Sequence, residues 1–354
     1  MATSKILALS TVLPPHTAPL ADVLPYSARW VQHQDEAFQQ KTEKIFKNAQ
    51  VDCRHSVVSL EHVFSRMTLD EKNALYQTHA VDLSETLLRQ ALDDAKLNPT
   101  DIDCLIVTSC TGHMSPSIDA VLVNRLGMKP SVQRLPVMEM GCMGGAAGLI
   151  YAENYLRAYP NHTVALITVE LPTITFQHDD YSWANVVSTA LFGDGAACAI
   201  LGPSNTLGPA IVRSAMYHFP DTTHLLGYNL TSTGFSMVLD EALPETIRQH
   251  FDQMIAELLD PEGLTLKDID HFIIHPGGKK ILHNIGLVLA AHGKSVDTSK
   301  SVLRDCGNLS SATVLFILKR FMDQPVKAGD RGLLLGIGPG LTACSVLLEW
   351  GAQP

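Results

Sequence analysis

The chain has 354 residues, of which 46% are hydrophobic and 18% charged, and its formal net charge is −10. A chain of this length can bury a large core and can form two domains. The negative charge argues against broad binding to nucleic acid or anionic membranes, although a local basic patch could still bind a polyanionic small molecule.

The cysteines and the apolar runs indicate the compartment. Seven cysteines occur, at positions 53, 104, 110, 142, 198, 306 and 344, and none forms a C-x-x-C pair. This pattern favours a reducing cytoplasm over a disulfide scaffold. No run approaches the roughly 18 apolar residues of a membrane span, so we expect no stable membrane insertion. The short apolar run at residues 5–13 ends directly before two prolines, which predicts a first strand rather than a signal peptide.

Apolar periodicity predicts helices and strands in alternation. In chain order, strands are expected at residues 5–13, 134–138, 163–171 and 333–337, and the run 134–138 is apolar enough to predict a buried strand. Helices are expected toward residues 38–46 and at 83–95, 118–126, 149–158, 184–192, 243–259, 279–291 and 310–322. This alternation implies an α/β protein with layered sheets.

Two pairs of similar segments indicate an internal duplication. Residues 97–107 and 264–274 both predict a turn followed by a buried strand, with Asp-Ile-Asp in register. Residues 193–201 and 338–347 both place a Gly-x-Gly turn before an apolar strand. Two matching pairs in the same order predict two related halves, 1–206 and 207–354, joined near the turn-rich residues 202–208.

The motif around Cys142 is the most informative part of the first half. Cys142 is surrounded by small residues at a predicted strand-to-helix turn, where the backbone can bend sharply and an acyl group can approach. Amide N–H groups at a helix start stabilise a thiolate, so Cys142 is a candidate nucleophile. From this motif alone, a buried structural cysteine is an equal alternative.

The second half offers a base and a hydrogen-bond donor. His275 ends a predicted strand before a Pro-Gly-Gly turn, the kind of position where sites on α/β sheets gather. His271 and His275 form an H-x3-H pair, but no third ligand is evident and we expect no metal site. Asn308 precedes a predicted helix and could donate to an enolate or oxyanion, although a plain N-cap asparagine is the simpler reading of an isolated residue.

Taken together, these motifs resemble those of the type III polyketide synthases, the chalcone-synthase-like enzymes. The resemblance rests on Cys142 in MGCMGG, His275 in HPGG, Asn308 in GNLSSAT and two further signatures at residues 191–197 and 336–342. It extends from about residue 5 to residue 350 and implies the duplicated αβαβα thiolase fold with layered mixed sheets. Ile337 departs from the plant pattern, which has a phenylalanine there.

The resemblance implies a catalytic cycle that needs no metal or redox cofactor. Cys142, in the first half, would take an acyl group from acyl-CoA with the help of His275, in the second half. His275 and Asn308 would then stabilise the enolate formed when malonyl-CoA loses CO2. That enolate would extend the acyl group by two carbons per round, and the product would cyclise. CoA thioesters are therefore expected as substrates rather than cofactors.

The resemblance also implies residues around this triad. Phe192 matches a gatekeeper between the CoA tunnel and the cavity, although by itself it would be taken for a core phenylalanine. Further substrate-binding candidates are Thr111, Thr175, Tyr228, Met237, Ser310 and Ile337. CoA-binding candidates are Gly277, Gly278 and Lys280 beside the pantetheine arm, and Lys41 and Lys44 near the phosphates.

Two expectations concern assembly and substrate. We expect a homodimer in which the loop at residues 111–117 reaches toward the partner. Residues 173–190 are similar to the segment in bacterial alkylpyrone and alkylresorcinol synthases, and Tyr228 and Met237 replace a glycine and a phenylalanine of the plant enzymes. We hypothesise a medium-to-long fatty acyl-CoA starter, because flexible Met237 can move aside for an alkyl chain. Acetyl-CoA, malonyl-CoA and an aromatic CoA starter stay open.

Three other functions are alternatives to a type III polyketide synthase. A ketoacyl-ACP synthase III shares the triad and the fold but performs one condensation, and it usually has an asparagine where this chain has Pro276-Gly-Gly. A silent partner subunit would generally lack the cysteine. A Cys-His hydrolase would need neither the duplication nor the 336–342 signature. The number of extensions in the product separates the first alternative from a polyketide synthase.

Overall fold

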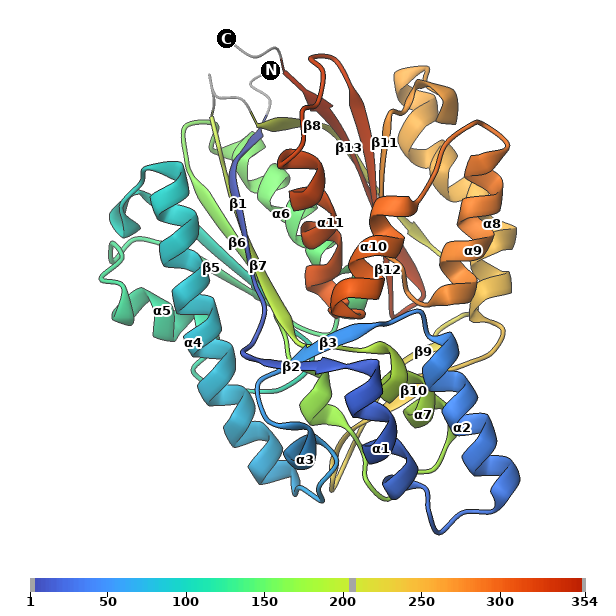
Figure 1. Ribbon diagram of the computed structural model, residues 1–354. Coiled ribbons are helices and arrows are strands. Elements are labelled where there is room, and N and C mark those ends of the chain that lie inside the picture. Colours follow the sequence, from blue (N-terminus) through green and yellow to red (C-terminus); the bar gives the residue numbers. More distant parts are fainter. Residues whose placement is uncertain (1–3, 204–207, 352–354) are drawn as a thin grey trace.

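One large mixed sheet forms the centre of the molecule (Figure 1). The computed structural model describes residues 4–203 and 208–351. Nine strands lie in the order β11-β12-β13-β8-β1-β7-β6-β4-β5. The N-terminal strands are β1 (Lys5–Val12), β4 (Cys104–Thr108), β5 (Gln133–Val137), β6 (Val164–Glu170) and β7 (Gly195–Gly202). The C-terminal strands are β8 (Pro209–His218), β11 (His271–Ile274), β12 (Arg331–Gly338) and β13 (Thr342–Trp350).

Helices lie outside and between these two groups of strands and form layers with them. The outer helices are α4 (Leu69–Ala95) and α5 (Ile118–Arg125) on the N-terminal strands, and α8 (Leu243–Leu259) and α9 (Lys279–Ala290) on the C-terminal strands. The inner helices are α6 (Gly144–Ala158), α10 (Asp297–Cys306) and α11 (Thr313–Met322), which share one apolar core with both groups of strands. This arrangement agrees with the expected αβαβα layers. The helix expected at 83–95 is the second half of α4, because the pattern continues N-terminally.

A cap closes one end of the layers, at the bottom of Figure 1. Its helices are α1 (Leu20–Trp30), α2 (Glu36–Asn48), α3 (Leu60–Val63) and α7 (Trp183–Leu191). Its strands form two separate pairs, β2 (His16–Pro19) with β3 (Cys53–Ser56), and β9 (Leu226–Thr231) with β10 (Gly234–Leu239). None of the described helices is both long enough and apolar enough to span a bilayer.

The similar segments of the two halves fold alike. Each begins with a 3-10 turn, η1 (Pro99–Asp101) or η5 (Leu266–Asp268), whose last aspartate accepts a backbone N–H at 2.7 or 2.8 Å. Each turn leads into a strand, β4 or β11, that pairs in parallel with a neighbour. The expected boundary between residues 206 and 207 lies outside the described ranges, so the division into two halves stays a prediction.

The expectation of a buried strand near residue 134 was wrong. Four of the five residues of β5 are exposed, including Leu135 at 41%. The reason is that β5 lies at the edge of the sheet and pairs only with β4 among the described strands. An apolar run shows that a strand forms, but it does not distinguish a central strand from an edge strand.

Candidate active site

Cys142 lies in a single 3-10 turn, η2 (Gly141–Met143), directly before α6. This turn packs closely against the end of β12, where a Cβ atom added to Gly338 would lie 2.5 Å from the carbonyl oxygen of Met140. Gly141 has a φ of +52° and faces Pro339. Because only glycine tolerates both the approach and the positive φ, the small residues around Cys142 hold the turn against β12.

His275 follows β11 and is fixed through its backbone. Its N–H donates to the carbonyl oxygen of Leu335 at 2.8 Å. The imidazole is 4% exposed, and neither ring nitrogen has a hydrogen-bond partner in the described part of the chain. The ring is therefore free to exchange a proton with a substrate or a neighbouring group.

Asn308 follows α10 and is oriented by its side-chain oxygen. Its backbone pairs with Phe192 in an isolated bridge, and its N–H donates to Leu191 at 2.9 Å. The side-chain Oδ1 accepts from the Ser310 N–H at 2.8 Å and from Thr313 Oγ1 at 3.3 Å. Since both of these contacts use the oxygen, the Nδ2 amide group is directed at the cavity, where the Asn308 side chain hydrogen-bonds the Cys142 thiol and opposes the rise in its pKa.

These three side chains line one cavity, which we call the central cavity, with an empty volume of about 460 Å³. Phe192, Met237, Gly277 and Ile337 line it as well. Cys142 precedes α6, whereas His275 follows β11 and Asn308 follows α10, so residues far apart in the chain meet in this cavity. The fold thus brings together the three residues expected to form a triad; their catalytic roles stay predictions.

Two further spaces adjoin the central cavity. The outer groove is lined by Gly277, Gly278, Lys280 and residues of α2 and α7, and it shares Leu191 and four other residues with the central cavity. The inner cavity is lined by Thr175, Tyr228 and cap residues, and it shares Phe192 and Met237 with the central cavity. Phe192 therefore lies at the boundary between the central and inner cavities.

The two lysines expected on α2 differ in their surroundings. The Nζ atom of Lys41 lies 3.7 Å from the centre of the Trp183 ring, and Trp183 lines the outer groove. Lys44 is exposed on the same helix and does not line the groove. Lys41 is thus beside the groove, while the structure shows no contact between Lys44 and the groove.

Thr111 does not line the outer groove, the central cavity or the inner cavity. Its hydroxyl donates to Glu170 Oε2 at 3.0 Å and accepts the Leu171 N–H at 2.9 Å. A hydroxyl with both partners inside the protein supports the end of β6 rather than facing these cavities. The structure therefore does not place Thr111 where a substrate contact was expected.

Glu170 is a buried residue that the sequence reasoning missed. Its carboxylate is fully buried and accepts from Ser311 Oγ at 2.6 Å and from the Cys110 N–H at 3.1 Å. Cys110 Sγ lies 3.5 Å from the same carboxylate and 3.7 Å from Ser310 Oγ. The available signal was a lone acidic residue at the end of an otherwise uncharged strand.

Burial is the largest cause of the pKa shifts of Cys142 and His275, the two titratable groups that line the central cavity. It raises the pKa of the Cys142 thiol to about 12; a hydrogen bond to Ser310 opposes this shift and the charge of Glu170 adds to it. Burial also lowers the pKa of His275 to about 3. Desolvation thus favours the uncharged form of each group, whereas the helix start and the local hydrogen bonds favour the thiolate of Cys142.

Comparison with known proteins identifies strong similarity over nearly the whole chain. The family models described as "Chalcone and stilbene synthases" match residues 1–205 with their N-terminal domain and residues 210–350 with their C-terminal domain. A 1,3,6,8-tetrahydroxynaphthalene synthase of Streptomyces peucetius subsp. caesius is 37% identical, over 98% of this chain and 93% of its own length. A phloroglucinol synthase of Pseudomonas fluorescens is 33% identical, over 90% and 92%.

A solved structure shows the same fold. The 1,3,6,8-tetrahydroxynaphthalene synthase of Streptomyces coelicolor A3(2), described as a bacterial type III polyketide synthase, superposes with a TM-score of 0.93. The match has 31% sequence identity and covers 99% of this chain and 100% of that one. The expected fold class is confirmed.

Replacing Glu170 by glutamine should lower the pKa of the Cys142 thiol. At the alkaline pH where a buried thiol titrates, Glu170 is ionised, and its negative charge disfavours the thiolate. The amide removes that charge, so the midpoint of Cys142 alkylation by iodoacetamide should move to lower pH. Peptide mass spectrometry would follow Cys142 separately from Cys110.

Glu153→Gln is the matched control, because Glu153 is also buried but is not among the groups that shift the pKa of Cys142. An unchanged alkylation midpoint in Glu170→Gln would contradict the electrostatic role of Glu170.

Proposed function

The chain belongs to the chalcone and stilbene synthase family, the type III polyketide synthases, and on that premise we propose that it condenses malonyl-CoA repeatedly onto an acyl group held on Cys142. The observation that carries this proposal is the position of Cys142, His275 and Asn308 in one cavity between an outer groove and an inner cavity. A thioester can enter by the groove, and the product can grow into the inner cavity.

Loading of the starter uses Cys142 and His275. Cys142 Sγ attacks the thioester carbon of the acyl-CoA and His275 takes the thiol proton, an exchange that suits a site where desolvation favours the uncharged form of each group. The carbon–sulfur bond to CoA then breaks, and the proton passes to the departing CoA sulfur. His275 suits this exchange because both of its ring nitrogens lack partners in the described chain.

Extension uses the same cavity without an external base. Malonyl-CoA loses CO2, and the electron pair of the broken bond forms an enolate whose oxygen accepts from Asn308 Nδ2 and from His275. The enolate carbon attacks the acyl carbon, and the bond to Cys142 Sγ breaks. Since decarboxylation itself generates the carbanion, we propose that no metal or redox cofactor takes part. The apolar side chains of Phe192 and Ile337 disfavour the charged malonyl carboxylate and favour loss of CO2.

The outer groove is the proposed CoA site. Lys280 lines it, and Lys41 lies against Trp183 beside it, so both can approach the phosphates of CoA. Gly277 and Gly278 have φ angles of +41° and +146° and leave room for the pantetheine arm. Lys44 is a weaker candidate because it lies outside the groove lining. All seven cysteines are unpaired, which supports the proposal of a reducing cytoplasmic location.

Two single substitutions test the proposed roles. Cys142→Ala should abolish the acyl-enzyme and the product, because the attacking sulfur is removed. Asn308→Ala should slow malonyl-CoA decarboxylation by about 10²–10³-fold, the usual loss for one oxyanion donor, while starter loading largely survives. Intact-protein mass spectrometry measures loading, and CO2 release measures decarboxylation.

These substitutions also separate the alternatives. Undiminished acyl-enzyme in Cys142→Ala would refute the assignment of the nucleophile. Loss of loading with intact decarboxylation in Asn308→Ala would refute the donor role. A product with a single extension would favour a ketoacyl synthase over a polyketide synthase.

For the starter, we propose a medium-to-long fatty acyl-CoA extended two or three times to an alkylpyrone or alkylresorcinol-type product. Support comes from the inner cavity, where Val23, Leu60, Val63 and Phe64 line one part of the wall. Each methylene buried there contributes about 0.8 kcal/mol, so longer acyl chains would bind progressively better until the cavity is full. Met237, at the boundary with the central cavity, can adapt to the chain.

A malonyl starter is a second candidate, and Arg54 favours it. This side chain is 5% exposed and lines the inner cavity; its Nη2 donates to Ala190 at 2.8 Å, while Nε and Nη1 have no partner among the described residues. A buried guanidinium without a carboxylate can bind the carboxylate of a malonyl group. The product names of two relatives, a tetrahydroxynaphthalene and phloroglucinol, also denote hydroxylated rings without an alkyl chain.

A panel of starters distinguishes these two candidates. If the starter is a fatty acyl-CoA, kcat/KM should rise with chain length from two to about twenty carbons, following the apolar burial of each methylene. Mass spectrometry of the products identifies starter and extension number together. A flat profile, or a clear preference for malonyl-CoA or an aromatic CoA, would refute the fatty acyl proposal. Loss of activity in Arg54→Met with malonyl-CoA alone would support the second candidate.

We also propose a homodimer, joined at the exposed edge of β5. An unpaired edge strand with an exposed apolar side chain is a template for pairing with another chain, and Leu135 is such a side chain. Light scattering should show a dimer at micromolar concentration, and Leu135→Glu should weaken it. Leu230→Glu is the control, because Leu230 is 67% exposed on the β9–β10 hairpin. A monomeric wild-type protein would count against the dimer.

A further inference from the structure

The hairpin of β9 and β10 is attached to the molecule in an unusual way. It forms its own two-stranded sheet and pairs with none of the nine strands of the large sheet. A two-stranded hairpin alone is only marginally stable in water, so its position depends on contacts with other elements. Tyr228, Phe235 and Met237 of this hairpin line the inner cavity. The contacts that hold the hairpin therefore determine the shape of that cavity.

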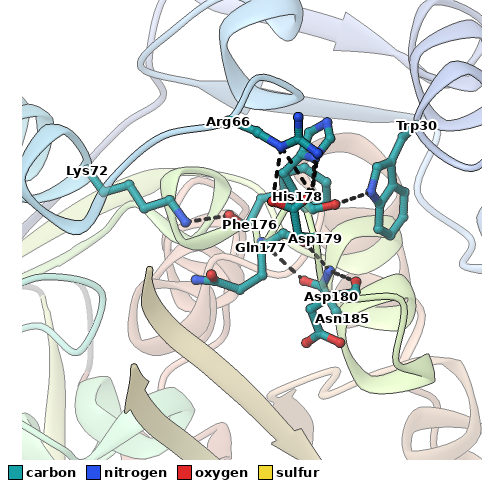
Figure 2. Close-up of polar contacts among 9 residues, drawn as sticks. All are labelled: Trp30, Arg66, Lys72, Phe176, Gln177, His178, Asp179, Asp180 and Asn185. Atoms are coloured by element: carbon teal, nitrogen blue, oxygen red, sulfur yellow. Dashed lines mark hydrogen bonds and ion pairs between the residues drawn. The ribbon is translucent and has the colours of Figure 1, made fainter. Parts of the chain in front are cut away.

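Lys72 makes one of these contacts from the long helix α4. Its side chain is buried, and Nζ donates to the carbonyl oxygen of Phe176 at 2.6 Å (Figure 2) and to that of Thr233 at 2.9 Å. Phe176 lies in the cavity wall, and Thr233 lies in the turn of the hairpin. One ammonium group thus joins two segments that adjoin the same cavity.

Gln177 makes a second contact between the same two segments. Its Nε2 donates to the carbonyl oxygen of Thr175 at 2.9 Å and to that of Phe235 at 3.1 Å. The hairpin turn lies tightly against both side chains, because a Cβ atom at Gly234 would lie 3.2 Å from Gln177 Nε2 and 3.3 Å from Lys72 Cδ. Gly234 has a φ of +117°, which also favours glycine.

The segment that carries Phe176 and Gln177 is held independently of the hairpin, as Figure 2 shows. Trp30 Nε1 donates to the carbonyl oxygen of His178 at 2.7 Å, and Asn185 Nδ2 donates to that of Gln177 at 2.7 Å. Arg66 forms an exposed ion pair with Asp179 at 2.8 Å. Because this segment has its own anchors, Lys72 and Gln177 serve to fix the hairpin relative to it.

We propose that Lys72 and Gln177 are positioning residues that set the depth of the inner cavity, and thereby the number of condensations, by holding the hairpin against residues 172–177. This inference rests on the proposed function. Neither side chain lines the inner or central cavity. Both act through the walls that they position, which include Phe176 and Phe235.

The charge on Lys72 is consistent with this role. Burial lowers the pKa of Lys72 to about 8, and its two acceptors in the structure are carbonyl oxygens rather than carboxylates. A lysine buried without a carboxylate costs free energy, which two charge-assisted hydrogen bonds offset in part. Releasing these bonds would let the hairpin move outward and would enlarge the space next to Phe192.

The test compares product length in variants that lose one contact each. Lys72→Met and Gln177→Leu remove the donors and keep most of the side-chain volume. With one fixed starter, the ratio of longer to shorter products should rise by about fivefold, the size expected when a hydrogen bond of ordinary strength is lost. The rate of malonyl-CoA decarboxylation and the thermal midpoint are measured in parallel. Decarboxylation should stay within about twofold, because Cys142, His275 and Asn308 all lie outside the hairpin and keep their own backbone contacts.

Two further variants serve as controls. Arg66→Gln removes an exposed anchor of the segment itself and should leave the product ratio unchanged. Lys72→Arg keeps a cationic donor and should restore most of the wild-type ratio. If Lys72→Met does not fold, Gln177→Leu decides, since Gln177 loses only neutral hydrogen bonds.

The possible outcomes separate this inference from the proposed function. An unchanged product ratio in folded Gln177→Leu overturns the positioning role. An equal loss of decarboxylation and product in these variants, without a shift in ratio, also overturns it, because it indicates general destabilisation. Absence of any polyketide from the wild-type enzyme with every starter would instead overturn the proposed function.

Discussion

The site depends on the close approach between the start of α6 and the 3-10 turn η6 (Ser310–Ala312). A Cβ atom at Gly145 would overlap the carbonyl oxygen of Ser311, so any side chain there would push the two segments apart. Cys142 precedes α6, and Asn308 precedes η6. This contact therefore sets the distance between Cys142 and Asn308, two residues that are far apart in the chain, so the candidate site forms only in the folded protein.

The same close packing produces the electrostatics. It buries His275 and leaves Cys142 only partly exposed, and desolvation moves the pKa of each group in the direction that favours its uncharged form. It also buries Glu170, whose carboxylate accepts hydrogen bonds from the Ser311 hydroxyl and from the backbone N–H of Cys110. In such an environment hydrogen bonds act more strongly than in water. The contacts of Ser310 and Thr313 to Asn308 Oδ1 orient the amide group that we propose as the donor to developing charge.

The layers and the cap have different tasks. The layers hold the backbones of Cys142, His275 and Asn308 through strand ends and buried helices. The cap provides the walls of the inner cavity, through α7, the segment 172–177 and the β9–β10 hairpin. The hairpin is not part of the large sheet, and polar contacts from Lys72 and Gln177 join it to the rest of the cap.

The sequence by itself determined those features that depend only on residues close to one another in the chain. Small residues around Cys142, a strand before His275 and a glycine before Asn308 are local features, and hydrophobic periodicity is local too, so the motifs, the layers and the duplication could be predicted. Burial and electrostatics depend on segments that only folding brings together. Lys72 is 104 residues from Phe176 and 161 from Thr233, and Glu170 is 141 residues from Ser311. The exposure of β5, the desolvation of Cys142, the position of Thr111 and the burial of Glu170 were thus decided by the tertiary structure, because each depends on neighbours distant in the chain.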